Sequence, residues 1–173
     1  MEQAILEVVG ALHAHCKQRG LTLAVAESCT GGLVSHYITA LPGASLFFKA
    51  GFVTYATEIK ERVLGVPPVV LSAYGVVSEE TAQAMAQRAR VIARTEYALA
   101  TTGNLGPDVL ENKKKGLVYI AVCREGATLS RRLQLSGSRA EIKEKASLEA
   151  LRFLVEIIER ATNTDSDIDT TGE

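Results

Sequence analysis

The spacing of apolar residues divides this chain into alternating helices and strands. Apolar side chains recur every three or four positions over residues 2–18, which is the spacing of one buried helical face. Continuous apolar runs of strand length follow, separated by glycine and proline. The predicted helices are residues 2–18, 31–41, a short segment through Lys60 to Gly65, 78–93 and a last helix from Ser138. The predicted strands are residues 21–26, 46–55, 97–101, 116–123 and 127–135.

Capping residues mark the starts of two of these helices. Ser78 precedes two glutamates, and acids in a first turn are favoured by the helix dipole. Ser138 and Glu141 have the spacing of a capping box. The short segment Arg124–Gly126 between the last two strands predicts a hairpin, and therefore an antiparallel pair at one edge of the sheet.

The order of the elements indicates the fold class. Helices that alternate with strands, with one hairpin added, predict an α/β fold, a three-layer α/β/α domain with a mixed sheet. The chain of 173 residues is long enough for one domain with a substantial core, which we assign to residues 1–161. Residues 162–173 are polar and acidic, and we expect them to form a disordered tail.

Charge and hydropathy exclude two classes of partner. The net charge of −1 argues against nucleic acid, because proteins that bind the phosphate backbone concentrate positive charge. No apolar run approaches the roughly 20 residues that span a bilayer, so no membrane partner is expected. The first seven residues carry acid where a signal peptide carries base, which favours a cytoplasmic protein.

Ser28 lies at a predicted corner between a strand and a helix, followed by Cys29, Thr30 and two glycines. Free N–H groups at the start of a helix bind anions, including a phosphate or the oxyanion of an acyl-transfer intermediate. Ser28 is therefore a candidate nucleophile, although a helix cap is the commoner role of such a serine. Cys29 is a second candidate nucleophile, but we favour a small buried residue at a tight turn.

A serine nucleophile needs a base, and the three histidines of this chain are poorly placed to supply one. His36 is two turns into the predicted helix and points away from the corner. Lys60 sits in an apolar context, and a lysine becomes a base when burial lowers its pKa towards neutrality. The three cysteines form no Cys-x-x-Cys pair, so neither a metal site nor a disulfide framework is expected. From the residues alone, a capping Ser28 and a surface Lys60 remain the simpler interpretations.

Several sequence blocks, in order, give the chain a resemblance to a known family. The blocks are Ala26-Glu-Ser-Cys-Thr-Gly-Gly32, Leu41-Pro-Gly-Ala-Ser45, Gly51-Phe-Val-Thr-Tyr-Ala-Thr-Glu-Ile-Lys60, Leu64-Gly-Val66, Gly75-Val-Val-Ser-Glu-Glu80, Ala100-Thr-Thr-Gly103 and Gly106-Pro107. With these blocks the chain resembles the CinA carboxy-terminal domain family, the nicotinamide mononucleotide (NMN) amidases, over nearly all of residues 5–160. The resemblance implies hydrolysis of NMN to nicotinic acid mononucleotide and ammonia, without a metal or another cofactor.

The resemblance also implies roles for individual residues. The nucleophile falls on Ser28, the general base on Lys60, and a supporting tyrosine on Tyr55. N–H groups of Cys29, Thr30 and Gly31 are candidates to receive the oxyanion. The remaining implied pocket residues, candidates to bind the substrate phosphate, are Ser45, Thr102 and Arg139, with Lys143 as the alternative to Arg139. The family resemblance further suggests a homodimer.

Two departures from the family pattern affect these expectations. After Thr102-Gly-Asn-Leu-Gly-Pro107, this chain continues with Asp108-Val-Leu-Glu-Asn-Lys113 where many relatives carry a glycine-rich stretch, which affects the rim of the pocket. We expect Lys113-Lys-Lys115 to be a solvated loop. Many relatives carry a larger domain before this module, and we expect its activity to be absent here.

The alternative function is that of a catalytically silent paralogue that binds a nucleotide. An assay for ammonia released from NMN distinguishes this alternative from the amidase.

Overall fold

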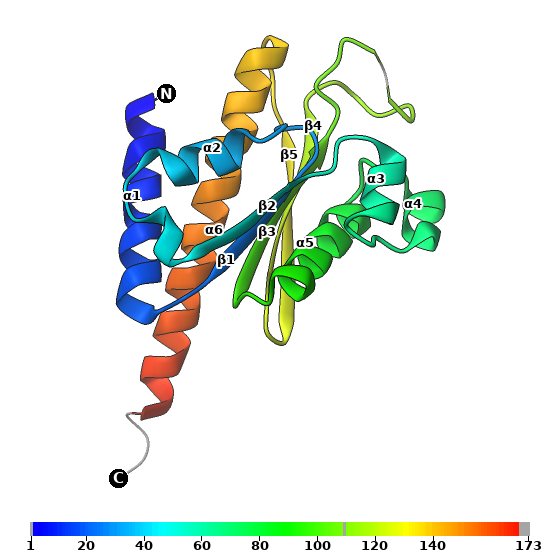
Figure 1. Ribbon diagram of the computed structural model, residues 1–173. Helices are drawn as coiled ribbons and strands as arrows, with labels where there is room; N and C mark the ends of the chain where they lie inside the picture. Colours follow the sequence, from blue (N-terminus) through cyan, green and yellow to red (C-terminus); the bar gives the residue numbers. More distant parts are fainter. Residues whose placement is uncertain (1, 109, 170–173) are drawn as a thin grey trace.

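A five-stranded mixed sheet organises the domain in the computed structural model, which describes residues 2–108 and 110–169 (Figure 1). The strand order is β2-β1-β3-β4-β5. The strands are β1 (Leu23–Glu27), β2 (Phe48–Val53), β3 (Tyr97–Gly103), β4 (Leu117–Arg124) and β5 (Ala127–Gln134). The helices are α1 (Glu2–Arg19), α2 (Leu33–Ala40), the 3₁₀ turn η1 (Ala44–Leu46), α3 (Thr57–Arg62), α4 (Pro68–Tyr74), α5 (Glu79–Ala93) and α6 (Arg139–Asp169).

The central strand β1 is parallel to both of its neighbours. Its last residue, Glu27, pairs with Val53 at the end of β2 and with Thr101 near the end of β3. The carboxyl ends of three parallel strands therefore meet at one edge of the sheet, where α/β proteins place their sites. The β4–β5 hairpin is antiparallel, as the sequence predicts, and extends the sheet beyond β3.

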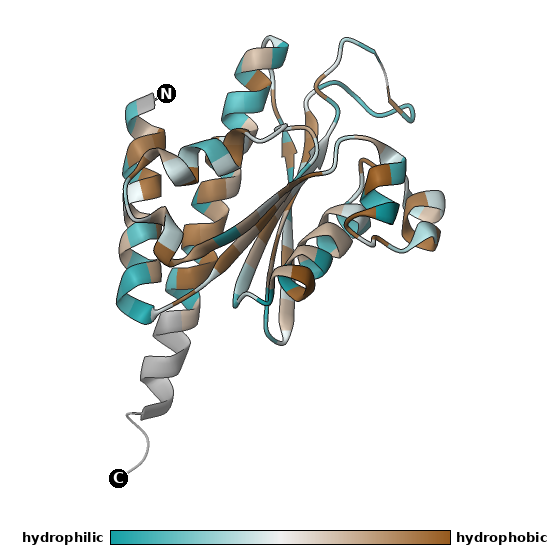
Figure 2. Ribbon diagram, in the orientation of Figure 1, coloured by the Kyte–Doolittle hydropathy of each residue, from teal (hydrophilic) through white to brown (hydrophobic). Residues whose placement is uncertain are grey.

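Helices cover both faces of the sheet, which confirms the predicted three-layer α/β/α architecture. Helices α1, α2 and α6 lie on one face, while α3, α4 and α5 lie on the other (Figure 1). The first interface is built from large aliphatic side chains and the second largely from alanines with Met85, Leu64 and Val66. Brown apolar segments accordingly converge on the sheet from both sides (Figure 2). Within the described part of the chain, no helix has the length and apolar character required to cross a membrane.

The predicted helix caps are present. Ser78 Oγ accepts the N–H of Thr81 at 3.1 Å, and the Ser138 N–H donates to Glu141 Oε2 at 2.7 Å in the reciprocal capping box. The structure has a further helix, α4, at residues 68–74, where the apolar pattern predicts no element. Pro67 and Pro68 do not prevent a helix there, because Pro67 is the N-cap and Pro68 occupies the first helical position, where its missing N–H and fixed φ are tolerated.

The end of α6 overlaps the segment for which the sequence predicts a tail. The helical backbone continues through Asp169, although the sequence predicted disorder from Thr162. Residues 170–173, the remainder of that predicted tail, lie outside the described residues.

Candidate active site

The corner that follows β1 lies at the carboxyl edge of the sheet and borders a cavity of about 320 Å³. The Ser28 N–H donates to Thr101 O at 3.0 Å, and the Thr54 N–H donates to Glu27 O at 2.9 Å. These backbone hydrogen bonds extend the sheet by one step and fix where Ser28 leaves it. Ser28 lines the cavity and is 8 % exposed. A cavity of this volume is at the small end of the range for sites that bind small molecules.

Lys60 lines the same cavity from α3, at the first turns after β2. It is 1 % exposed, and its Nζ donates to Thr54 O at 2.8 Å and to Tyr55 O at 3.1 Å. Burial lowers the pKa of Lys60 from 10.5 to about 8, while Cys29, Glu111 and Glu58 partly oppose this shift. An amine with this pKa is neutral in a useful fraction of molecules near neutral pH.

Ser28 and Lys60 thus share one cavity, as the resemblance implies. The hydrogen bonds between described residues do not include one that joins Ser28 Oγ to Lys60 Nζ. Catalytic hydrogen bonds in a site without substrate are often long, so geometry of this kind does not rule out a nucleophile–base pair.

Cys29 borders the cavity as a buried neutral thiol. It is 5 % exposed, and burial raises its pKa to about 12, so the nucleophilic thiolate is scarce at neutral pH. These properties agree with the interpretation of Cys29 as a small buried residue at the turn. They leave Ser28 as the candidate nucleophile of this corner.

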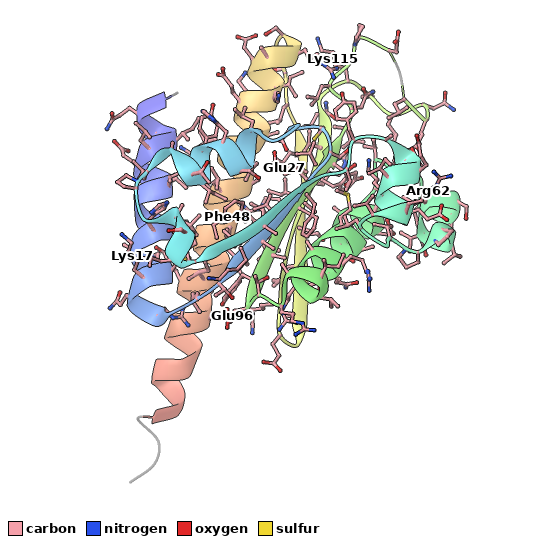
Figure 3. The ribbon with its side chains drawn as sticks, in the orientation of Figure 1. Lys17, Glu27, Phe48, Arg62, Glu96 and Lys115 are labelled. Atoms are coloured by element: carbon pink, nitrogen blue, oxygen red, sulfur yellow. The ribbon has the colours of Figure 1, made fainter. Side chains whose placement is uncertain are left out.

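Glu27 occupies the start of α2 and was not predicted to belong to the site. Its buried carboxylate accepts hydrogen bonds from Thr30 Oγ1 at 2.6 Å, from the N–H groups of Gly32 and Val34 at 3.0 and 3.1 Å, and from the N–H and hydroxyl of Ser35 at 2.8 and 2.7 Å. Figure 3 labels Glu27 at this edge of the sheet, near α2. An acid as the last residue of a strand, one short turn before a helix, is the signal that sequence reasoning could have used.

The position of Glu27 corrects the expected anion site. The N–H groups at the start of α2 are already paired with its carboxylate, so they are not available to a substrate phosphate or oxyanion. The Gly31 N–H donates to Ser28 O at 3.1 Å, which also removes Gly31 from the predicted oxyanion donors. The backbone N–H groups of Cys29 and Thr30 remain as candidates, whereas the Thr30 side chain faces Glu27 and Thr101.

Arg139 and Tyr55 meet at this edge although 84 positions separate them in the sequence. Arg139 Nη2 donates to the Tyr55 hydroxyl oxygen at 2.6 Å, and Nη1 donates to Gly106 O. Tyr55 lines the cavity and is 58 % exposed, so this pair lies at the mouth. Lys143, one turn further along α6, places its Nζ 3.4 Å from where a Cβ on Gly31 would be. Both cations considered for the phosphate therefore lie near the Ser28 corner.

Of the two hydroxyl residues expected in the pocket, Thr102 lines the cavity and Ser45 does not. Thr102 is buried, lines the cavity and donates its hydroxyl to Val76 O at 2.6 Å. The structure does not bring Ser45 to the cavity within one chain. Ser45 lies in η1 before β2, and β2 is parallel to β1, so η1 is at the opposite edge of the sheet from Ser28.

The lysine run of the β3–β4 loop also differs from the prediction of a solvated loop. Lys113 Nζ donates to Tyr74 O at 3.1 Å, to Val77 O, and to Glu111 Oε2 at 3.2 Å. Lys114 and Lys115 are exposed, as expected. Across the residues that the structure describes, no group of three or more histidines, cysteines or acids is arranged to hold a metal ion.

Comparison with known proteins gives consistent matches to one family. Residues 6–158 match the model of the CinA C-terminal domain. A CinA-like protein of Geobacter sulfurreducens is 44 % identical over 139 residues, covering 80 % of this chain and 34 % of that protein. A CinA-like protein of Frankia casuarinae is 42 % identical over 156 residues, covering 90 % of this chain and 36 % of that protein. The chain thus spans about a third of the length of these curated relatives.

A solved structure shares the fold over almost its whole length. The competence or damage-inducible protein from Enterobacter asburiae is similar with a TM-score of 0.86 and 33 % sequence identity, covering 89 % of this chain and 98 % of that one.

Proposed function

Because the chain belongs to the CinA C-terminal domain family, we propose that its cavity hydrolyses the carboxamide of NMN, with Ser28 as nucleophile and Lys60 as general base. The observation that carries this proposal is the burial of Lys60, with a pKa lowered to about 8, on the same small cavity as Ser28. A charged lysine that is buried without a paired acid destabilises the folded state, whereas a neutral amine does not carry this penalty. A buried lysine of this kind is therefore a candidate for a functional group that acts in its neutral form.

The hydrogen bonds of Lys60 support its use as a base. A neutral amine has two N–H donors and one lone pair, and the carbonyl oxygens of Thr54 and Tyr55 accept two donors. The lone pair is then left for the proton of Ser28. In this arrangement the two carbonyls orient the base, while burial favours its neutral form.

The proposed reaction has two stages. Ser28 Oγ attacks the carboxamide carbon while Lys60 takes the hydroxyl proton, and the N–H groups of Cys29 and Thr30 receive the oxyanion. The tetrahedral intermediate collapses when Lys60 returns the proton to the leaving nitrogen, which releases ammonia and leaves an ester on Ser28. Water then attacks the ester carbon while Lys60 takes a proton from it. Lys60 returns this proton to Ser28 Oγ as the ester C–O bond breaks, so nicotinic acid mononucleotide departs and Ser28 and Lys60 are restored.

Positive charge on α6 supports binding of the substrate phosphate. Glu27 fills the start of α2, and the side chains of Arg139 and Lys143 reach Tyr55 and Gly31 beside this corner. Tyr55, fixed by Arg139 at the mouth, supports the dyad, and Thr102 forms part of the pocket. The family resemblance also supports a homodimer that acts in the cytoplasm.

Incubation of the chain with NMN, with assays for ammonia and for nicotinic acid mononucleotide, tests this function. We expect stoichiometric release of both products, loss of release in Ser28→Ala, and retention of release in Thr39→Ala, which removes an exposed hydroxyl of α2. NMN binding without any ammonia would contradict hydrolysis and support instead the silent nucleotide-binding paralogue.

A further inference from the structure

The tip of the β3–β4 loop, residues Leu110–Lys113, forms a tight turn with strained backbone. Leu110 and Lys113 make an isolated antiparallel bridge, and the two residues between them have φ values of +53° at Glu111 and +57° at Asn112. Two central residues with positive φ are characteristic of a type I′ turn, in which glycine or asparagine is favoured. A glutamate in this conformation is strained and persists only where other contacts hold it.

Those contacts join the loop tip to the segment between α4 and α5, residues Tyr74–Val77. Glu111 accepts the Val76 N–H at 2.8 Å and the Val77 N–H at 3.3 Å. Lys113 donates to the carbonyls of Tyr74 and Val77, and to Glu111 itself. Glu111 thus accepts hydrogen bonds from backbone N–H groups of this segment, and Lys113 donates hydrogen bonds to its backbone carbonyl groups.

Gly75 allows this close approach. Its φ is +81°, and a Cβ at this position would lie 2.4 Å from Glu111 Oε2. The loop tip is also held to the start of its own loop, because Asn104 Nδ2 donates to Lys113 O at 2.9 Å. In Figure 1 the loop leaves the sheet at the carboxyl edge of β3, above α3 and α4.

The joined segments form an apolar part of the cavity wall. Val76, Val77 and Leu110 line the cavity that also contains Ser28 and Lys60. The hydrogen bond from Thr102 Oγ1 to Val76 O ties the same segment to β3. An apolar surface beside the nucleophile suits the flat aromatic ring that carries the amide of the substrate.

We propose that Glu111 and Lys113 are positioning residues that clasp the loop tip to residues Tyr74–Val77 and so fix the apolar wall that binds the aromatic ring of the substrate. The identity of that ring rests on the proposed function. The clasp itself is independent of it, because it concerns contacts between segments of the chain. Neither residue touches the reacting atoms.

Two substitutions test the clasp, each with a matched control on the exposed surface. Glu111→Gln removes the charge at nearly constant size, and Lys113→Met removes the donors at nearly constant length. Glu125→Gln and Lys114→Met make the same chemical changes at exposed positions outside the clasp. Amide hydrogen exchange at Val76 and Val77, measured by NMR in each full-length variant, reports the clasp without reference to catalysis. We expect exchange at these two amides to be about tenfold faster in both test variants, with core strands unchanged.

Affinity and turnover then test the wall. The dissociation constant for NMN is measured in a Ser28→Ala background, and KM and kcat in the active chain at pH 9, where Lys60 is mostly neutral. We expect both test variants to raise the dissociation constant and KM about tenfold while kcat stays within about twofold, since a lost charge-assisted hydrogen bond corresponds to a factor of this order. Both controls should match the parent chain.

The outcomes separate the clasp from the proposed function. Unchanged exchange at Val76 and Val77 overturns the clasp, and faster exchange with unchanged NMN affinity overturns its role in the wall. A drop in kcat alone would also overturn a positioning role in binding. If the parent chain binds NMN but releases no ammonia, the proposed hydrolysis fails, while exchange and affinity still decide the clasp. If NMN does not bind at all, the assigned substrate and the ring-binding wall both fail, and exchange alone decides the clasp.

Discussion

Replacing Lys60 by methionine removes a buried amine and leaves an unbranched apolar side chain that is shorter by one atom. The pKa of Lys60 in the folded protein is about 8, against an ordinary value of 10.5. Between these two values the unfolded chain binds more protons than the folded one, so the contribution of Lys60 to stability rises with pH. Below about pH 8 both states are protonated, and the folded state carries the full penalty of a buried charge.

The size of this effect follows from the same two pKa values. A difference of this size corresponds to about 3 kcal/mol, of which about 2 to 3 kcal/mol should appear between pH 7 and pH 10. Lys60→Met loses this pH dependence. It also loses the donors to Thr54 O and Tyr55 O, but that cost is nearly independent of pH and cancels when the slopes are compared.

The assay is urea unfolding of the parent and Lys60→Met chains at intervals from pH 7 to pH 10. The difference in free energy of unfolding should change by about 2 to 3 kcal/mol in favour of the parent as pH rises. Lys49→Met, at an exposed position on β2, is the matched control and should show no such change. Parallel curves for parent and Lys60→Met would refute the lowered pKa.

The pH dependence of ammonia release should also reflect the pKa of Lys60. Below about pH 8, the rate of ammonia release should fall about tenfold per pH unit, because about a tenth of Lys60 is neutral at pH 7. Lys60→Arg should be nearly inactive, since a guanidinium stays protonated and cannot accept the serine proton. If Lys60→Arg keeps most of its turnover, Lys60 binds substrate charge and the base must be sought elsewhere, with Tyr55 first.

Three further predictions follow from the site. Ser28→Ala should abolish ammonia release with a free energy of unfolding within about 1 kcal/mol of the parent, and a folded variant that keeps its activity would make Ser28 only a cap. Glu27→Gln should lower the free energy of unfolding in urea by about 2 to 4 kcal/mol, because an amide cannot accept all the hydrogen bonds that converge on this buried carboxylate; an effect as small as that of exposed Glu125→Gln would contradict this. EDTA should leave ammonia release unchanged, since the described residues contain no metal-ligand cluster; loss of activity that a divalent ion restores would show this to be wrong.

Local signals in the sequence were sufficient for most of the secondary structure. The spacing of apolar residues predicted α1 and the strands, and the caps at Ser78 and Ser138 predicted where α5 and α6 begin. These features are local because helix periodicity and capping involve residues three or four positions apart. No helix was predicted at α4, which begins at the Pro67-Pro68 pair, yet the first turn of a helix accepts proline.

The candidate site depended on the sequence in a different way. The family blocks pointed to Ser28, Lys60 and Tyr55, but composition could not show that Lys60 is buried. Its burial results from the way α3 folds back at the end of β2, where the carbonyls of Thr54 and Tyr55 meet its amine. A lysine next to apolar residues in sequence is equally compatible with an exposed position, and only the packing of the sheet edge distinguishes the two.

Tertiary structure alone decided which groups share the cavity. Parallel pairing of β1 and β2 placed Ser45 at the far edge of the sheet, and the buried carboxylate of Glu27 took the start of α2 from any substrate anion. Lys113, expected in solvent, instead joins a loop to residues 36 positions away. Such outcomes depend on strand direction and on long-range closure of the chain, neither of which is fixed by the identity of neighbouring residues.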